Sequence, residues 1–275
     1  MQKLDRLGWA EGISFRAYGV AIGVRANRAE AIQPLSDLFP PGWKATTGPV
    51  RRLYSLTAAD LQRPGGRRMN LVWADTQRIG QSKQLELALH VFESDLHRYV
   101  AEWAPRHCFV HAGVVGWNGK AIVIPGRSFA GKSTLVAELV RAGASYYSDE
   151  YAVLDRRGRV HPFARPLALR ASGGFKQEQQ PVPGLERCHG QRPLPIGLVV
   201  VSRYRPGAHW RPRRLSAGQG VLALLSNTVS ARRRPDLALS SLRRAVQEAK
   251  VIQGVRGEAR QAAAAILSQL ESQAA

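Results

Sequence analysis

The sequence predicts an α/β fold in which a strand, a glycine-rich loop and a helix follow one another directly. Three observations favour this class. Apolar runs of strand length alternate with helical patterns beyond residue 105. An Asn-Gly turn at 118–119 lies between two such runs, which is typical of a β-hairpin. The segment 81–103 repeats apolar residues at helical spacing, which indicates a long amphipathic helix with one buried face.

The composition is that of a globular chain with a strong positive charge. Of the 275 residues 44% are hydrophobic, and 40 Lys and Arg against 20 Asp and Glu give a net charge of +20. This charge favours an anionic partner without choosing among nucleic acid, nucleotide, acidic peptide and membrane surface. Cys108 and Cys188 make no disulfide framework, no apolar run is long enough to span a bilayer, and no signal-peptide core is seen. A soluble, cytoplasmic protein is expected.

We expect two regions that meet near Pro105: a small α+β accessory region at residues 1–104 and the main α/β domain at residues 105–275. In the first region, breaks at 40–42 and 63–68 separate the elements. The pattern there predicts a β segment Ile13–Val24, a helix around Ala29–Leu38, a strand Asn70–Ala74 and a helix Gln81–Trp103.

The second region is expected to carry most of the regular structure. The pattern predicts strands at His111–Val115, Ala121–Pro125 and Ile196–Tyr204, a hairpin of Tyr151–Asp155 with Arg159–Pro162, and helices at Ser133–Ala142, Gly220–Val229, Leu237–Ala249 and Ala259–Ser272. Gly143 should end the first of these helices as a left-handed cap. A further short strand should end at Asp149-Glu150.

The glycine-rich loop carries the clearest chemical signal. It matches the pattern G-x-x-x-x-G-K-[ST] and comprises Gly126, Arg127, Ser128, Phe129, Ala130, Gly131, Lys132, Ser133 and Thr134. Its glycines let backbone N–H groups turn inward around an anion, and the following helix adds the positive end of its dipole. Lys132 is expected to reach the β- and γ-phosphates, and the Ser133 hydroxyl to bind Mg²⁺. The loop therefore predicts binding of a nucleoside triphosphate.

An acidic pair, Asp149-Glu150, follows Ser133 by only sixteen and seventeen residues. One helix and one short strand fill that interval, so the strand after the loop helix should bring both carboxylates to the phosphates. A carboxylate there can hold Mg²⁺ through water or accept a proton from an attacking hydroxyl. Tyr146-Tyr147 before the pair and the apolar segment 152–154 after it indicate buried strands rather than a surface turn.

Together with His111, fifteen residues before Gly126, these features resemble the catalytic domain of the HPr serine kinase/phosphorylase family. The similarity is closer to its divergent relatives, including kinases that modify serine in peptides such as lasso-peptide precursors, and covers about residues 105–170. It implies a P-loop core related to phosphoenolpyruvate carboxykinase, with ATP and Mg²⁺ as cofactors. The implied acceptor is a serine of a small protein or peptide, and a homo-oligomer is implied because the family forms assemblies.

The resemblance also implies catalytic roles for Lys132, His111, Asp149 and Glu150. We favour Asp149 as the base and Glu150, with Ser133, as a metal partner. The identity of the base stays open, because this chain has Asp-Glu where the family has Asp-Asp.

The chain departs from the family after the acidic pair. The family carries a glutamate-arginine-glycine segment further along the chain, which supplies a metal ligand and supports phosphorolysis. Residues 166–174 here contain no acidic residue. We therefore expect a kinase without efficient phosphorolysis and an acceptor other than HPr, and Arg165 and Arg170 are candidates for stabilising phosphate charge.

Two other functions stay open: a non-catalytic nucleotide-sensing module and a nucleic-acid-binding P-loop ATPase. Arginine pairs and triplets are scattered along the chain and are not interleaved with aromatic residues, so nucleic acid is not the expected partner, and neither is a membrane. A GTPase is not expected because no guanine-reading motif is present. The segment Leu215–Gln219 resembles a transporter-ATPase signature, but no strand ending in Asp-Glu follows it, and Ser216 is expected to cap a helix instead.

Overall fold

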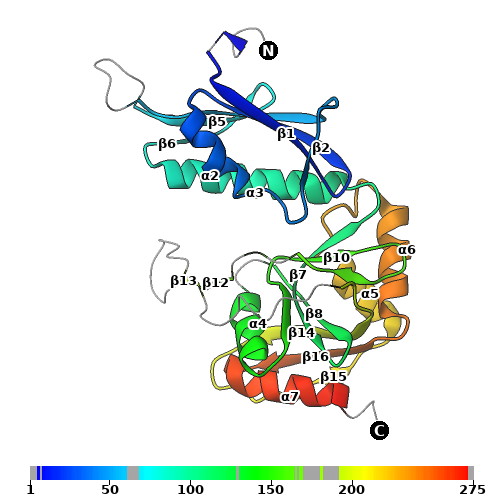
Figure 1. Cartoon of the computed structure of the whole chain (residues 1–275). Coiled ribbons are helices and arrows are strands. Elements are labelled where there is room, and N and C mark those ends of the chain that lie inside the picture. Colours follow the sequence, from blue (N-terminus) through cyan, green and yellow to red (C-terminus); the bar gives the residue numbers. More distant parts are fainter. Residues whose placement is uncertain are drawn as a thin grey trace. The chain divides into compact units, whose positions relative to one another are not determined.

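The computed structural model describes residues 5–6, 8–60, 68–127, 130–163, 165, 167–169, 180–181 and 192–271. The chain divides into two compact units, Met1–Pro105 and Arg106–Ala275. Each unit contains its own mixed sheet, so the protein belongs to the mixed α/β class (Figure 1). Among the helices that the structure describes, none combines the length and apolarity that a bilayer crossing requires.

The first unit is a six-stranded sheet with its core between one sheet face and the helices. The strand order is β3-β1-β2-β4-β5-β6, and the pairing is antiparallel except between β2 and β4. The elements are β1 (Glu11–Ala17), β2 (Val20–Ala26), η1 (Ala29–Ala31), α2 (Ile32–Ser36), β3 (Lys44–Ala45), β4 (Arg52–Thr57), β5 (Asn70–Ala74), β6 (Gln77–Ser82) and α3 (Leu85–Trp103). Phe92 and Leu96 of α3 pack in the same core as Ile22 and Tyr54 of the sheet.

Two predictions for this unit are wrong. The single β segment Ile13–Val24 is a hairpin, because Tyr18 and Gly19 both adopt positive φ angles (48° and 87°) and turn the chain back. The helix begins at Leu85 rather than Gln81, because β6 continues to Ser82 and pairs there with β5. The predicted strand Asn70–Ala74 and the helix end at Trp103 are confirmed, whereas β4 and β6 lacked a clear sequence signal.

The second unit is an eight-stranded sheet of order β11-β10-β7-β8-β14-β16-β15, with β9 also paired to β7. Its strands are β7 (Cys108–Trp117), β8 (Lys120–Pro125), β9 (Ser145–Ser148), β10 (Tyr151–Leu154), β11 (Val160–His161), β14 (Ile196–Tyr204), β15 (Arg213–Arg214) and β16 (Lys250–Arg256). Its helices are α4 (Lys132–Arg141), α5 (Ala217–Leu225), α6 (Pro235–Val246) and α7 (Ala259–Glu271). A separate two-stranded pair joins β12 (Ala168–Leu169) to β13 (Gln180–Pro181). Because β8, β14 and β16 are parallel, their carboxyl ends lie at one edge of the sheet.

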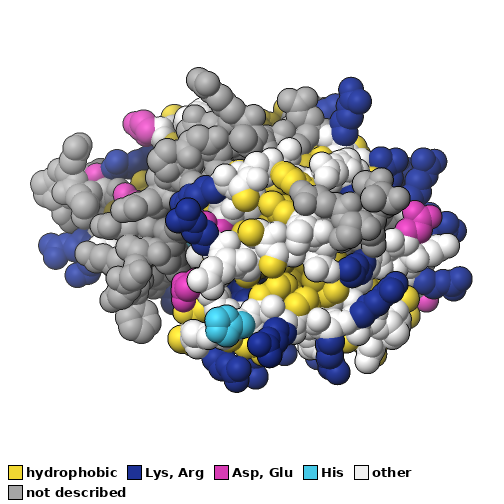
Figure 2. Space-filling model, turned by 90° about the horizontal axis from the view of Figure 1, so that it is seen from below, with side chains coloured by type: hydrophobic (Ala, Val, Ile, Leu, Met, Phe, Trp, Pro, Cys, Tyr) yellow, Lys and Arg dark blue, Asp and Glu magenta, His cyan; other side chains and the backbone are white. Residues whose placement is uncertain are grey.

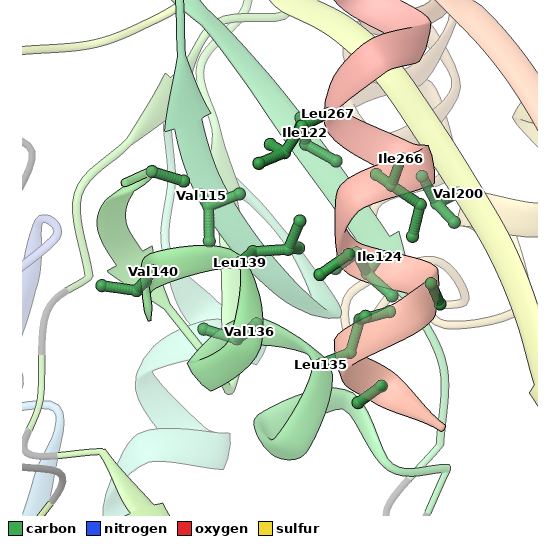
Figure 3. Close-up of a cluster of buried hydrophobic side chains, with 14 of the residues drawn as sticks. Val115, Ile122, Ile124, Leu135, Val136, Leu139, Val140, Val200, Ile266 and Leu267 are labelled. Carbon is green, nitrogen blue, oxygen red and sulfur yellow. The ribbon is translucent and has the colours of Figure 1, made fainter. Parts of the chain in front are cut away.

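Helices cover both faces of this second sheet. In β8, Ile122 and Ile124 belong to the cluster with α4 and α7, and the intervening Val123 belongs to the cluster with α5 and α6. Figure 3 shows side chains of α4 and α7 converging on the side chains of β8. This alternation is what a strand buried on both faces requires.

Several predicted elements of the second unit are confirmed. The hairpin of β7 and β8 turns at Asn118-Gly119, β14 runs over Ile196–Tyr204 as predicted, and Gly143 ends α4 with a φ of 102°. Ser216 caps α5 reciprocally with Gln219, so that helix begins at Ala217 rather than Gly220. The strand β16, however, was not predicted.

The positive charge is spread over the face of the molecule that Figure 2 shows. On the face drawn in Figure 2, Lys and Arg side chains lie in separate groups around exposed hydrophobic side chains, with few Asp or Glu among them. This distribution agrees with the scattered arginine pairs of the sequence.

Candidate functional site

The glycine-rich loop connects the end of β8 to the start of α4. The Gly126 N–H donates to the His111 carbonyl (3.1 Å), which ties the loop entrance to β7. At the loop exit Gly131 has a φ of 73° and caps α4, so a side chain there would be strained. Ser128 and Phe129 lie outside the described residues. The loop thus ends directly at the helix N-terminus, where backbone N–H groups have no helical partner.

Lys132 is the first residue of α4 and folds back over the loop. Its Nζ donates to the Arg127 carbonyl at 2.9 Å. Burial lowers the pKa of Lys132, and the carboxylates of Asp149 and Glu150 oppose that shift. The ammonium therefore lies in a partly desolvated place beside two acids, where an added anion would interact with it strongly.

Ser133 and Asp149 are in direct contact. The Ser133 Oγ donates to Asp149 Oδ2 at 2.8 Å, and the Tyr146 hydroxyl donates to Asp149 Oδ1 at 3.0 Å. Burial raises the pKa of Asp149 above its usual range, although the two hydrogen bonds lower it. The fold therefore brings Asp149 of the acidic pair into contact with Ser133, the serine expected to bind Mg²⁺.

The turn after β9 presents the acidic pair. Ser148 is buried, and its Oγ accepts from the N–H groups of Glu150 (3.1 Å) and Tyr151 (3.0 Å), which fixes the backbone between β9 and β10. The Glu150 carboxylate pairs with Arg165 (Oε2 to Nη1, 2.7 Å). The Glu150 side chain remains 33% exposed, so the second carboxylate faces solvent.

His111 lies on β7, opposite Tyr151 of β10. The two ring centroids are 4.8 Å apart. Burial lowers the pKa of His111 more than the Glu150 carboxylate raises it, and the Lys132 ammonium lowers it further. The imidazole is therefore neutral near pH 7, beside the loop and the acidic pair.

Sequence reasoning missed Arg256, the last residue of β16. This arginine is 2% exposed, and its Nη2 donates to the Gly131 carbonyl at 2.9 Å while its Nη1 donates to the Gly257 carbonyl at 3.1 Å. A Cβ placed on Gly131 would lie 2.5 Å from that Nη2, so a larger residue there would also displace the Arg256 guanidinium from the Gly131 carbonyl. The β-branched residues Val251, Ile252 and Val255 were the signal that could have found the strand.

The remaining residues singled out in the sequence do not contact the two carboxylates through their side chains or lie outside the described residues. Thr134 is exposed on α4, and Arg127 contributes its carbonyl to Lys132. Arg170 and Cys188 are outside the described residues. Cys108 is buried, which raises its thiol pKa to about 12, so it is not a reactive thiol.

The site thus joins a glycine-rich loop, a lysine, a serine and two carboxylates at the carboxyl edge of a sheet, a place where α/β proteins commonly bind ligands. A scan of the chain against protein-family models gives no match, and a search of curated proteins gives none.

Proposed function

We propose that the second unit is an ATP- and Mg²⁺-dependent kinase with a P-loop core related to phosphoenolpyruvate carboxykinase. Its acceptor is a hydroxyl, that of a serine in a small protein or peptide. One observation carries the proposal: the Ser133 hydroxyl lies 2.8 Å from Asp149 at the head of the loop helix, next to Lys132. This combination of hydroxyl, buried carboxylate and lysine at a helix N-terminus suits a phosphate chain with its metal.

The chemistry of the donor set fits Mg²⁺. The Ser133 hydroxyl and the Asp149 carboxylate are hard oxygen ligands. Asp149 has no Lys or Arg within ion-pair distance among the residues that the structure describes, and its pKa is raised by burial. These two side chains would hold the ion, which neutralises phosphate charge when bound.

The geometry favours exchanging the two carboxylate roles that the sequence suggested. Asp149 is the acid that touches Ser133, whereas the Glu150 side chain is partly exposed to solvent and forms an ion pair with Arg165. We therefore assign metal support to Asp149 and the base to Glu150. Glu150 would take the seryl proton while the seryl oxygen bonds to the γ-phosphorus and the bond to the ADP oxygen breaks.

Lys132 and Arg165 supply the positive charge for this transfer. The Lys132 ammonium would exchange its hydrogen bond to the Arg127 carbonyl for one to the phosphates. Its flexible side chain can reach both acceptors. Arg165, released from Glu150, would stay beside the transferred group. His111 would act as a neutral hydrogen-bonding group that positions the loop entrance or the acceptor.

The decisive experiment measures MgATP binding by calorimetry and ADP formation in the presence of serine peptides. Lys132→Ala should weaken both, and Lys120→Ala is the matched control because Lys120 is exposed at the other end of β8. Equal behaviour of both variants and the unmodified chain would overturn the proposal.

A nucleotide-sensing module is the second candidate, and one observation favours it. The Glu150–Arg165 ion pair at 2.7 Å occupies the carboxylate that a kinase would need free. Tight MgATP binding without ADP formation, unchanged in Glu150→Gln, would indicate a sensor instead of a kinase.

A further inference from the structure

A second site lies in the same unit, away from the glycine-rich loop. It is an open cavity of about 1070 Å³ between the start of β7, the β10–β11 turn and the segment before β14. Its lining includes five arginines: Arg106, Arg156, Arg157, Arg159 and Arg192. Two histidines and one carboxylate, His107, His161 and Asp155, complete most of its wall. We call it the arginine cavity.

The positive charge of the arginine cavity is not neutralised within the described part of the chain. None of its five arginines pairs with a carboxylate there, and Arg159 donates instead to the Pro193 carbonyl (Nη2 to O, 2.8 Å). The single carboxylate, Asp155, is already engaged by His161 (3.1 Å) and by backbone N–H groups. Clustered guanidinium groups without an acidic partner repel one another, and an anionic ligand would relieve that repulsion.

The cavity wall is ordered by these same contacts. Asp155 accepts from the N–H groups of Arg157 (2.8 Å) and Arg159 (3.0 Å), which fixes the turn that presents the arginines. The His107 and His161 rings meet edge to face at 5.2 Å. Arg156, Arg157 and Arg159 are thus held on an ordered turn, and a ligand need not order that part of the backbone in order to bind.

The arginine cavity is connected to the candidate catalytic carboxylates by a single strand. Glu150 immediately precedes β10 and Asp155 immediately follows it. Five residue steps along an extended strand span about 16 Å. An extended peptide would cover the same distance with about five residues.

We infer that the arginine cavity binds an acidic segment of the protein or peptide that accepts the phosphate, with that segment about five residues from the accepting serine. The inference rests on the proposed kinase function. Each guanidinium can donate two parallel hydrogen bonds to one carboxylate, so several arginines together favour a run of Asp and Glu. Among the described residues that line the cavity there is no Trp, Tyr or Phe, and the His107 and His161 rings are the aromatic groups there, so stacking of single-stranded bases is less favoured than binding of carboxylates.

The first test measures binding without ATP. A fluorescent peptide with five consecutive glutamates is titrated with the full chain, and its anisotropy is followed at two salt concentrations. Arg156→Ala/Arg157→Ala, which changes two exposed side chains of the turn, should weaken binding about tenfold, and higher salt should weaken it further. Arg211→Ala/Arg214→Ala is the matched control, because these arginines are exposed near the opposite edge strand β15.

The second test asks whether the bound peptide is the acceptor. Two peptides of equal composition carry a serine either five residues from the glutamates or directly beside them. The first should be phosphorylated with the lower KM, and Arg156→Ala/Arg157→Ala should remove that advantage while leaving MgATP affinity unchanged.

Three results would overturn the inference. The unmodified chain does not bind the glutamate peptide; or the control variant loses as much affinity as the cavity variant; or a single-stranded oligonucleotide of equal charge binds more tightly through the same arginines. If the peptide binds through the arginines but no ADP forms with either peptide, the kinase function fails and only the acidic-peptide site stands.

Discussion

Each unit contains a partly buried aspartate that accepts a hydrogen bond from a tyrosine. The two aspartates differ in whether an arginine also donates to them. In the first unit Asp95 accepts from the Tyr54 hydroxyl (2.8 Å), from Arg52 (3.1 Å) and from Arg98 (2.5 Å). In the second unit Asp149 accepts from Tyr146 and Ser133, and no Lys or Arg of the described residues reaches it.

Under the proposed function, this difference separates a structural acid from an acid that would hold a metal ion. The charge of Asp95 is offset by two guanidinium groups, so it links β4 to α3. Burial raises the pKa of Asp149, and its hydrogen bonds to Ser133 and Tyr146 and the charge of Arg165 offset that rise only in part. A buried acid in this state beside a serine and a glycine-rich loop suits a cation bound at closer range than the Lys132 and Arg165 charges that act on it.

Lys132→Ala should give the largest effect on the functional side of this comparison. Removing the ammonium should reduce phosphate transfer about 10²–10³-fold or more, because preorganised charge at the phosphates is lost. The thermal unfolding midpoint should stay within about 2 °C, since surface and ligand-facing substitutions change stability little. ADP formation measures the loss of phosphate transfer, and thermal unfolding followed by circular dichroism measures the midpoint. Loss of the fold would make Lys132 structural, like Arg52 beside Asp95.

Glu150→Gln tests which acid is the base. We expect turnover to fall about 10²-fold with nearly unchanged MgATP affinity, because a base contributes about 10²–10⁴-fold to proton transfer. Asp149→Asn should instead raise the Mg²⁺ concentration needed for half-maximal rate. A Mg²⁺ titration of both variants separates the roles. Rescue of Glu150→Gln by excess Mg²⁺, with Asp149→Asn inactive throughout, would return the roles to those that the sequence suggested.

Arg256→Lys should have a smaller effect. Lysine keeps the charge but cannot donate to the Gly131 and Gly257 carbonyls with the fixed fork of a guanidinium. We expect the KM for MgATP to rise about tenfold or less, with kcat changed less than KM, because positioning of the loop is loosened. Arg203→Lys, on the exposed end of β14, is the matched control. A fall in kcat alone would place Arg256 at the reacting atoms.

The smallest expected effect is that of Asp149→Asn on stability, where the direction of the change in unfolding midpoint is the informative result. A raised pKa means that folded Asp149 binds its proton more tightly than the unfolded chain does, so stability falls as pH rises through the usual aspartate range and the loss persists at pH 7. Asp149→Asn should therefore raise the unfolding midpoint of the ligand-free chain, by about 2–4 °C per kcal/mol recovered.

Asp95→Asn should lower the midpoint, because it removes the acid that Arg52 and Arg98 share and leaves them only the longer ion pairs with Asp75 (3.4 Å) and Glu102 (3.8 Å). Calorimetry at pH 5 and pH 7 compares the two variants and resolves separate transitions if the units unfold independently. Equal destabilisation by both substitutions would remove the distinction between the two aspartates.

Much of the second unit could be predicted from the sequence because its signals are local. The Asn118-Gly119 turn, the cap at Gly143 and the Ser216 capping box each depend on residues within one turn of the chain. The contact of Ser133 with Asp149 was also predictable, since only α4 and β9 separate the two residues and a short helix–strand unit brings its ends together.

The first unit shows where such reasoning fails. The turn at Tyr18-Gly19 is formed by a tyrosine with positive φ, which is not a common turn signal. Strand β6 shows little apolar alternation, and its place was decided by pairing with β5. Edge strands of this kind take their structure from a neighbour and not from their own propensity.

The sequence by itself determined the glycine-rich loop, its helix and the acidic pair, because each arises from short-range backbone preferences. Only the tertiary structure decided that β16 lies parallel to β14, which brings Arg256 to Gly131 across 125 residues of chain. Only the tertiary structure gathered Arg106, Arg157 and Arg192 around one cavity. The physical reason is the same in both cases. Pairing between distant strands depends on which faces are buried together, and the spacing of residues along the chain does not predict it.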